Sequence, residues 1–400
     1  MEDELDHQSG WDYIELTQRY VLAVLYHSTG GDDWTKDAPT SWFRESSVCE
    51  WVGVGCDENR EINDLTFQND NLQGIIPKEI GALTVMTSLR LSRNALAGPI
   101  PSELGQLTAM QEMWLFGNDL TGPIPSQIGQ LTAMEGFYLY DNTLTGPIPS
   151  ELGQLTALTW LSFYNNDLTG PIPSEIGQLT EMQRLRLNEN SLTGPIPSEL
   201  GQLTAMEQLY LRDNALSGPI PSELGQLTAM QELWLHRNDL NGPIPSELGQ
   251  LTAMEELFLR DNALSGSIPS ELGQLTAMTS LTLYDNALTG LIPSELGQLT
   301  AMVAFYLYNN ALTGTVPNEL TQLTNLRFIE LHNNDLIGAV PRGFCTVLFP
   351  DWRNYSPVFA TDCISQIQCD CCDRCYDEAG NRFEWSKSEG AFVSPLDGCL

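Results

Sequence analysis

Residues 194–217 read GPIPSELGQLTAMEQLYLRDNALS, and close variants of this 24-residue stretch recur through most of the chain. Its asparagine returns every 24 residues without an insertion, at Asn94, Asn118, Asn142, Asn166, Asn190, Asn214, Asn238, Asn262, Asn286, Asn310 and Asn334. Asp70 holds the same position one turn earlier. A strict period of this length over twelve turns predicts an α/β repeat solenoid, in which each turn buries its apolar face against its neighbours.

The turn around Asn214 shows what each repeat is expected to form. Alternating apolar residues predict a short strand with an apolar inner face, made by Met206, Leu209, Leu211 and Leu216. Gly218 and Pro219 are expected to break this strand and to start an irregular return path. Asn214 is expected to bond the backbone of its own turn and of the next one. Stacking then supplies the core that a single turn lacks.

The motif LTxLxxLxLxxNxLxGxIPxxLGxL resembles the plant-type leucine-rich repeat of receptor ectodomains and polygalacturonase-inhibiting proteins. The resemblance covers residues 62–341, which we interpret as twelve repeats. It implies a right-handed superhelix with a concave parallel sheet of about 12 strands, one per turn. It also implies that ligands bind along the inner, concave face.

The two ends of the chain are expected to cap the solenoid, because open ends would expose apolar core. Residues 1–61 form the predicted N-terminal cap, with a helix that ends at Gly30–Gly31. The segment from Cys49 to Cys56 resembles the CxWxGVxC element of plant-type caps, which implies a Cys49–Cys56 disulfide.

Residues 342–400 form the predicted C-terminal cap and hold seven cysteines: Cys345, Cys363, Cys369, Cys371, Cys372, Cys375 and Cys399. The run CDCCDRC resembles the caps of large algal leucine-rich-repeat proteins, in which it commonly ends in a cysteine pair, whereas Tyr376 follows Cys375 here. Disulfides of unassigned pairing are the favoured interpretation. A zinc site is the alternative, because the CxxC spacing suits zinc.

Charge and targeting signals restrict the function further. With 18 Lys plus Arg against 52 Asp plus Glu, the net charge of -34 disfavours nucleic acid and anionic membranes as partners. The apolar stretch Tyr20–Tyr26 is too short to cross a bilayer. The first ten residues have no signal-peptide pattern, yet cysteines confined to the two ends are typical of capped extracellular proteins. We therefore expect an extracellular or cell-surface protein, monomeric by preference, whose targeting segment lies outside this chain.

The outward positions of the predicted strands change from turn to turn, whereas the segment IPSELGQLTAM hardly changes. Aromatic and arginine side chains, the usual hot-spot types at interfaces, are enriched at these outward positions. The predicted ligand-binding residues are Trp114, Phe116, Tyr138, Tyr140, Trp160, Tyr164, Arg184, Arg186, Tyr210, Arg212, Trp234, His236, Phe258, Arg260, Tyr284, Tyr306 and Tyr308. The competing interpretation is that aromatic residues stack across strands and serve packing alone.

Several finer features carry their own expectations. The arginines gathered in the middle turns predict a ligand with some negative character. His236 and His332, four turns apart, are expected to be surface histidines. Calcium binding by Glu255, Glu256, Asp261 and Asp285 is a disfavoured alternative. A row of Thr and Ser just before the repeat glycines predicts side-chain bonding along a second short sheet, with ice binding as the alternative.

No nucleophile elbow, HExxH, P-loop or dinucleotide fingerprint occurs in the sequence, so we expect neither an enzyme nor a cofactor. The predicted function is a recognition module that binds a protein, peptide or glycan. An inhibitor of the polygalacturonase-inhibitor kind is the second hypothesis. A structural or ice-interacting surface protein is the third.

Overall fold

Each 24-residue turn folds into two short strands and one 3-10 turn. A computed structural model describes residues 13–35, 42, 46–341 and 343–344, and the backbone alone of 358–361, 367–368, 374–376, 382–386 and 391–393. The chain forms two compact units, Met1–Thr193 and Gly194–Leu400, which we call unit 1 and unit 2 and describe separately. The division into two caps and a repeat region stays a prediction.

Unit 1 begins with helix α1 (Tyr13–Ser28), where the sequence predicts a helix, and with the 3-10 turns η1 (Gly31–Asp33) and η2 (Val48–Glu50). Strand β1 (Val54–Cys56) then pairs antiparallel with the first repeat strand. The main sheet of unit 1 continues in parallel through β2 (Ile62–Thr66), β4 (Ser88–Arg90), β6 (Glu112–Trp114), β8 (Gly136–Tyr138), β10 (Trp160–Ser162) and β12 (Arg184–Arg186).

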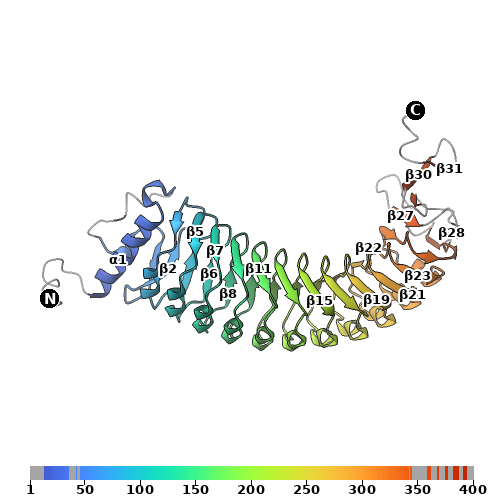
Figure 1. Cartoon of the computed structure of the whole chain (residues 1–400), viewed down its shortest axis with the longest axis horizontal. Helices are drawn as coiled ribbons and strands as arrows, with labels where there is room; N and C mark the ends of the chain where they lie inside the picture. Colours follow the sequence, from blue (N-terminus) through green and yellow to red (C-terminus); the bar gives the residue numbers. More distant parts are fainter. Residues whose placement is uncertain are drawn as a thin grey trace. The chain divides into compact units, whose positions relative to one another are not determined.

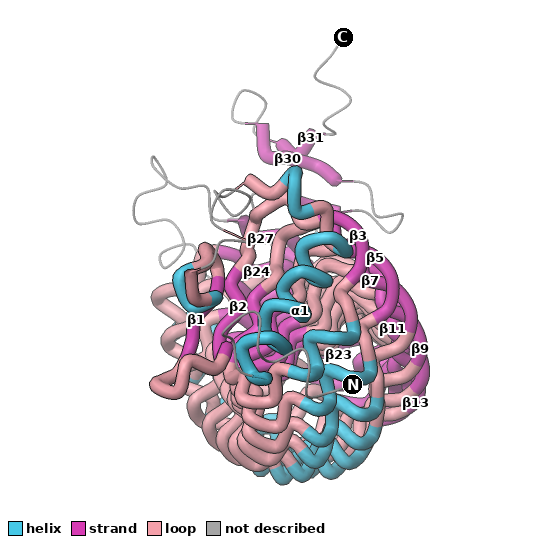
Figure 2. The backbone as a smooth tube through the Cα atoms, turned by 90° about the vertical axis from the view of Figure 1, so that its left-hand side faces the viewer, coloured by secondary structure: helices cyan, strands magenta, loops and turns pink. Residues whose placement is uncertain are grey.

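A second parallel sheet and a row of 3-10 turns complete unit 1 (Figures 1 and 2). The second sheet comprises β3 (Gln73–Ile75), β5 (Ala95–Pro99), β7 (Asp119–Gly122), β9 (Thr143–Gly146), β11 (Asp167–Gly170) and β13 (Ser191–Gly194). The turns are η3 (Lys78–Ala82), η4 (Ser102–Gln106), η5 (Ser126–Gln130), η6 (Ser150–Gln154) and η7 (Ser174–Gln178).

Unit 2 repeats the same arrangement. Its main sheet contains β14 (Gln208–Tyr210), β16 (Glu232–Trp234), β18 (Glu256–Phe258), β20 (Ser280–Thr282), β22 (Ala304–Tyr306) and β24 (Phe328–Glu330). Its second sheet contains β15 (Ala215–Pro219), β17 (Asp239–Gly242), β19 (Ala263–Ser267), β21 (Ala287–Leu291), β23 (Ala311–Gly314) and β25 (Asp335–Leu336). The turns are η8 (Ser198–Gln202), η9 (Ser222–Gln226), η10 (Ser246–Gln250), η11 (Ser270–Gln274), η12 (Ser294–Gln298) and η13 (Asn318–Gln322).

Short strands follow the last repeat of unit 2. They are β26 (Gly338–Ala339), β27 (Val358–Thr361), β28 (Ile367–Gln368), β29 (Arg374–Tyr376), β30 (Arg382–Ser386) and β31 (Ala391–Val393). Strand β27 adds to β24 in parallel, and β26 pairs with β28. The side chains of the seven C-terminal cysteines lie outside the described residues, so their predicted disulfides stay a prediction.

The predicted solenoid is confirmed, with six main-sheet repeat strands in each unit, but two expectations about the return path are wrong. Gly218 and Pro219 do not break a strand, because both lie in β15, part of the second sheet. The return path is not irregular, since each turn forms a five-residue 3-10 helix. Gly153 shows one reason why the 3-10 helices of successive turns stack regularly. A Cβ at this position would lie 2.5 Å from the backbone oxygen of Glu175 in the next turn. Only glycine allows the 3-10 turns to stack this closely.

The core of each unit lies between the two sheets and the 3-10 turns, and its Leu, Ile and Met side chains are almost completely buried. Asn118 shows how the repeat asparagine closes the core. Its Nδ2 donates to Leu91 O at 3.1 Å and to Leu115 O at 3.0 Å, and its Oδ1 accepts from Leu96 N at 3.0 Å. The asparagine therefore bonds its own turn and the preceding one, whereas the sequence analysis expected the next one.

The N-terminal segment covers the first turn of unit 1 with a cluster of rings. Trp34 and Trp42 pack edge to face at 5.1 Å between centroids, and Trp42 lies 5.1 Å from Trp51. Phe67 of the first repeat contacts Trp34 at 4.9 Å. The structure contains the Cys49–Cys56 disulfide, with a Cα–Cα distance of 5.6 Å, beside this cluster.

Candidate functional site

The outward side of the main sheet, which we call the strand face, carries the predicted binding residues. In unit 1 the aromatic members are Trp114, Phe116, Tyr138, Tyr140, Trp160 and Tyr164, and together they form what we call the unit 1 aromatic surface. Tyr140 stacks on Phe116 at 4.2 Å and on Tyr164 at 4.5 Å between ring centroids. These contacts follow from the parallel register, which places residues 24 positions apart on adjacent strands.

A second row of rings lies beside this stack. Tyr138 packs edge to face on Trp114 at 5.7 Å and on Trp160 at 6.0 Å between centroids. The guanidinium of Arg184 lies 4.1 Å from the centre of the Trp160 ring, a cation–π contact. Gly136 makes this packing possible, because a Cβ there would lie 2.8 Å from the ring of Tyr138. The sequence analysis did not single out Gly136, although glycine in a strand signals a close approach.

The rings of the unit 1 aromatic surface pack against one another and stay only partly exposed. Burial is the largest cause that raises the pKa of Tyr138 and of Tyr164 to about 12, so both phenols are neutral at physiological pH. The indole Nε1 of Trp114 is buried and has no hydrogen-bond partner among the described residues. An unpaired donor of this kind is costly, and it is compatible with a partner supplied from outside.

The strand face of unit 2 carries its own stack of rings. Tyr210 lies on Trp234 at 4.0 Å and Trp234 lies beside Phe258 at 5.5 Å between centroids. Two members of the predicted site are covered here, since Tyr210 is 8% exposed and His236 is 4% exposed. The expectation that His236 and His332 are surface histidines is wrong, because neighbouring rings cover both side chains.

A further group of rings occupies the later strands of unit 2. Tyr284 stacks on Tyr308 at 4.2 Å and packs edge to face on Tyr306 at 6.5 Å between centroids. Tyr308 in turn stacks on His332 at 4.6 Å. The structure thus groups Tyr284, Tyr306 and Tyr308, as the sequence pattern suggests.

Three arginines on the strand face of unit 2 form ion pairs with two aspartates. Arg212 donates to Asp213, and Arg260 donates to Asp261. Arg237 lies between these two carboxylates, 3.2 Å from Asp213 and 3.8 Å from Asp261. Burial tends to raise the pKa of Asp213, but the bonds from Arg212 and Arg237 outweigh it and hold the pKa low. These three arginines share two aspartates, so their positive charge is largely offset within the chain, and the negative character expected of the ligand stays a prediction.

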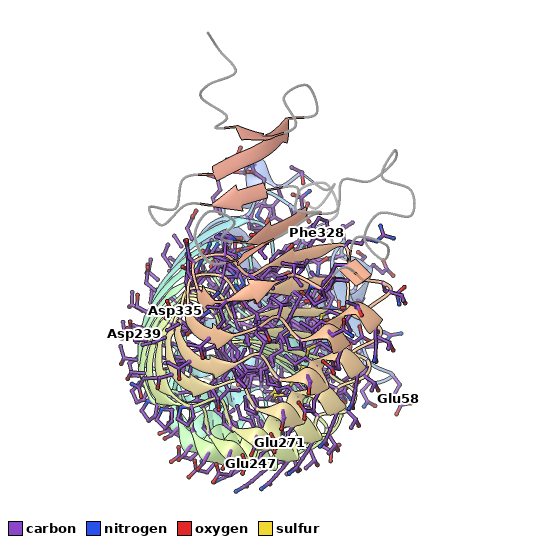
Figure 3. All side chains as sticks on the ribbon, turned by 90° about the vertical axis from the view of Figure 1, so that its right-hand side faces the viewer. Glu58, Asp239, Glu247, Glu271, Phe328 and Asp335 are labelled. Carbon is purple, nitrogen blue, oxygen red and sulfur yellow. A yellow bond between two sulfur atoms is a disulfide. The ribbon has the colours of Figure 1, made fainter. Side chains whose placement is uncertain are left out.

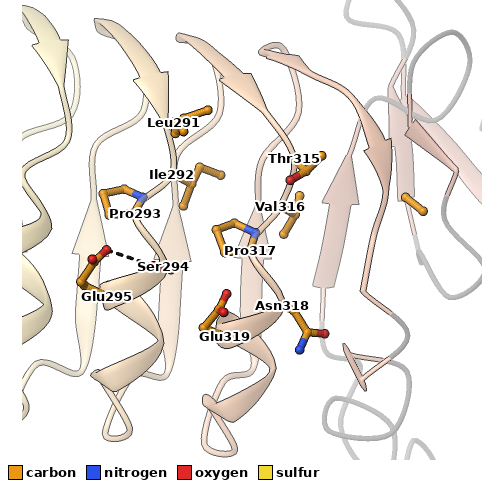
Figure 4. Close-up of a pocket in the computed structure, with 11 residues that line it drawn as sticks. Leu291, Ile292, Pro293, Ser294, Glu295, Thr315, Val316, Pro317, Asn318 and Glu319 are labelled. Carbon is orange, nitrogen blue, oxygen red and sulfur yellow. Dashed lines mark hydrogen bonds between the residues drawn. The ribbon is translucent and has the colours of Figure 1, made fainter.

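Other features of the described residues lie away from the strand face or carry no site. No group of three or more His, Cys, Asp or Glu side chains gathers as it would around a metal ion in the part of the chain that the structure describes. No helix among the described residues is long and apolar enough to cross a membrane. A hollow of about 560 Å³ lies beside the second sheet of unit 2, between Leu291 and Glu319 (Figure 4). It is shallow and lined by repeat residues such as Pro293 and Pro317.

Comparison with known proteins identifies the family. The model for "Leucine-rich repeat region" matches residues 150–260, and the model for "Leucine Rich Repeat" matches residues 253–275 and 277–299. The leucine-rich-repeat protein LIC12759 of Leptospira interrogans is 31% identical, over 78% of this chain and 75% of its own, with a TM-score of 0.61. The chain belongs to the leucine-rich-repeat family.

Plant leucine-rich-repeat proteins are also similar. The plant peptide hormone receptor RGFR1, solved in complex with RGF2, is 34% identical with a TM-score of 0.70, over 75% of this chain and 46% of its own. A plant ice-binding protein is 27% identical with a TM-score of 0.61, over 82% of this chain and 98% of its own. Phytosulfokine receptor 2 of Arabidopsis thaliana is 39% identical over 62 residues. This match spans 15% of this chain and 6% of the receptor, so the chain corresponds to a small part of that protein.

Proposed function

We propose that this leucine-rich-repeat chain is a non-enzymatic recognition module that binds an extended peptide or protein segment on its strand face. The observation that carries the proposal is the unit 1 aromatic surface, where six rings lie side by side and stay partly exposed. Partly exposed aromatic side chains supply large contact area at low entropic cost. The similarity to a receptor solved with its peptide hormone supports the same class of ligand.

The module acts outside the cell in this proposal. The Cys49–Cys56 disulfide supports an oxidising compartment, because reducing conditions in the cytosol disfavour such bonds. The similar plant receptors are in keeping with that location.

A displayed library of random linear 12-residue peptides tests the proposal. Peptides enriched on the wild-type protein should lose binding to the variant W114A/Y138A/Y140A, because this variant removes three of the six rings. The control variant Y13A/Y20A removes two exposed rings of helix α1 and should keep binding. The variant W114A/Y138A/Y140A loses stacking contacts worth about 1 kcal/mol each, so binding is measured well below its melting temperature. Enriched peptides that bind W114A/Y138A/Y140A as tightly as the wild type would contradict the proposal.

Ice binding is a second candidate, supported by one specific observation. The threonines that precede the repeat glycines in unit 1, such as Thr121, Thr145 and Thr169, are exposed along the second sheet. The plant ice-binding protein matches this chain over nearly its whole length. Thermal hysteresis of the purified protein, lost when Thr145 and Thr169 become Lys, would favour this function over peptide recognition.

A further inference from the structure

Two carboxylates on adjacent strands of unit 2 lack a cationic partner among the residues that the structure describes. Glu232 of β16 and Glu256 of β18 are register neighbours in the parallel sheet. Their bonds come from neutral donors: Gln208 and Tyr210 donate to Glu232, and Trp234 Nε1 donates to Glu256 at 3.1 Å. Burial first, and then the charge of Glu232, raise the pKa of Glu256. Like charges side by side in a sheet are destabilising, so the presence of this glutamate pair calls for an explanation.

Unit 1 contains the first glutamate and the tryptophan of this arrangement with a cation present, whereas Gly136 stands at the position of Glu256. Five turns earlier in the sequence, Glu112 and Trp114 occupy the positions of Glu232 and Trp234. There the chain's own Arg90 bonds Glu112 at 2.8 Å and lies 4.8 Å from the centre of the Trp114 ring. The position that corresponds to Arg90 in unit 2 is Tyr210. Unit 2 therefore keeps the glutamate and the tryptophan but lacks the guanidinium.

The next strand adds an unpaired polar group on the same face. Thr282 of β20 is the register neighbour of Phe258 and continues the row of Trp234 and Phe258. Its side chain is 7% exposed, and its Oγ1 has no hydrogen-bond partner among the described residues. A hydroxyl in this state can accept a bond from an N–H donor that a ligand brings.

We propose that the face formed by Glu232, Glu256 and Thr282 receives an arginine side chain of a basic peptide ligand. The inference rests on the proposed function, since it names the chemistry of the peptide that the strand face takes. A guanidinium is planar and has five N–H donors, so it can bridge carboxylates on strands about 4.8 Å apart. The net charge of -34 further favours a basic partner over an acidic one.

A labelled hexapeptide of alternating Arg and Gly is the probe, measured by fluorescence anisotropy on the full chain. E232Q/E256Q should weaken its binding at least about tenfold, because each lost charge-assisted bond is among the strong ones. The control E247Q/E271Q removes the same charge from exposed glutamates of η10 and η11, which Figure 3 shows on the side of unit 2 away from Phe328. It should change the affinity less than about twofold.

Matched peptides and one further variant sharpen the result. The peptide with citrulline in place of Arg should not bind, and the peptide with Lys should bind several-fold more weakly. Y210R restores the arginine that unit 1 has, so it should fill the site and abolish binding of the probe while the protein stays folded by circular dichroism.

Four outcomes would overturn the inference. Two concern the protein: E232Q/E256Q and E247Q/E271Q lose the same affinity, or Y210R binds the probe as the wild type does. Two concern the ligand: the citrulline or the Lys peptide binds as tightly as the Arg peptide, or micromolar Ca²⁺ displaces the probe. A failure of this inference can be distinguished from a failure of the proposed function. The proposed function is tested with W114A/Y138A/Y140A in unit 1, and this variant should leave binding of the Arg probe intact.

Discussion

Mild acid should destabilise unit 2 through two buried histidines. His236 and His332 are 4% and 6% exposed. Burial is the largest cause that lowers their pKa values, to about 3 for His236 and about 4 for His332. The nearby positive charge of Arg260 lowers the pKa of His236 further. Both imidazoles are therefore neutral in the folded protein throughout the neutral and mildly acidic range.

The magnitude follows from the difference between the folded and unfolded states. In the unfolded chain both histidines have the ordinary pKa of about 6.5. The unfolded chain therefore binds protons first as the pH falls, and stability is lost from about pH 6.5 downward until the folded protein is itself protonated near pH 4 and 3. Between about pH 8 and pH 5 each histidine should lower the free energy of unfolding by about 2 kcal/mol.

Urea unfolding followed by circular dichroism at these two pH values, on the wild type and on H236F/H332F, measures the effect. Phenylalanine keeps a ring beside Trp234 and Tyr308 but does not titrate. The many carboxylates contribute equally to both proteins, so the difference between the two pH dependences isolates the histidines. The wild type should lose about 4 kcal/mol more than the variant. Identical pH dependences in the two proteins would refute the reasoning.

Three further tests of the scaffold measure stability by chemical denaturation. Asn142→Ala should cost about 3 kcal/mol or more, because it leaves three buried backbone groups without partners, whereas the exposed Asn59→Ala should cost less than about 0.5 kcal/mol. Gly153→Ala should cost about 2 kcal/mol or more, since its Cβ would meet the next turn's backbone; a cost near zero would mean that the stacking is loose. Replacing Cys49 and Cys56 with Ala should cost about 2 kcal/mol, and a reductant should destabilise the wild type by about that much more than it destabilises this variant.

The repeat architecture was readable in the sequence because it is a local property repeated many times. Every turn contains the same three signals: the 24-residue period, the alternating apolar residues of a strand, and the recurring asparagine. Each of them predicts the same geometry. The outward positions were also readable, because side chains alternate across a strand whatever packs against it. Trp114, Tyr138 and Trp160 therefore meet as the pattern predicts.

Side-chain exposure and charge pairing were decided only by the tertiary structure. Residues 24 positions apart come into contact through the parallel register, and a linear pattern does not show which neighbour a side chain leans toward. Hence Tyr210 and His236 are covered, although the sequence placed both at the binding face. Arg212, Arg237 and Arg260 likewise share the carboxylates of Asp213 and Asp261, pairings that the linear pattern did not show. The pairing of Arg90 with Glu112 in unit 1, and the lack of a cation beside Glu232 and Glu256 among the described residues of unit 2, likewise depend on contacts between turns.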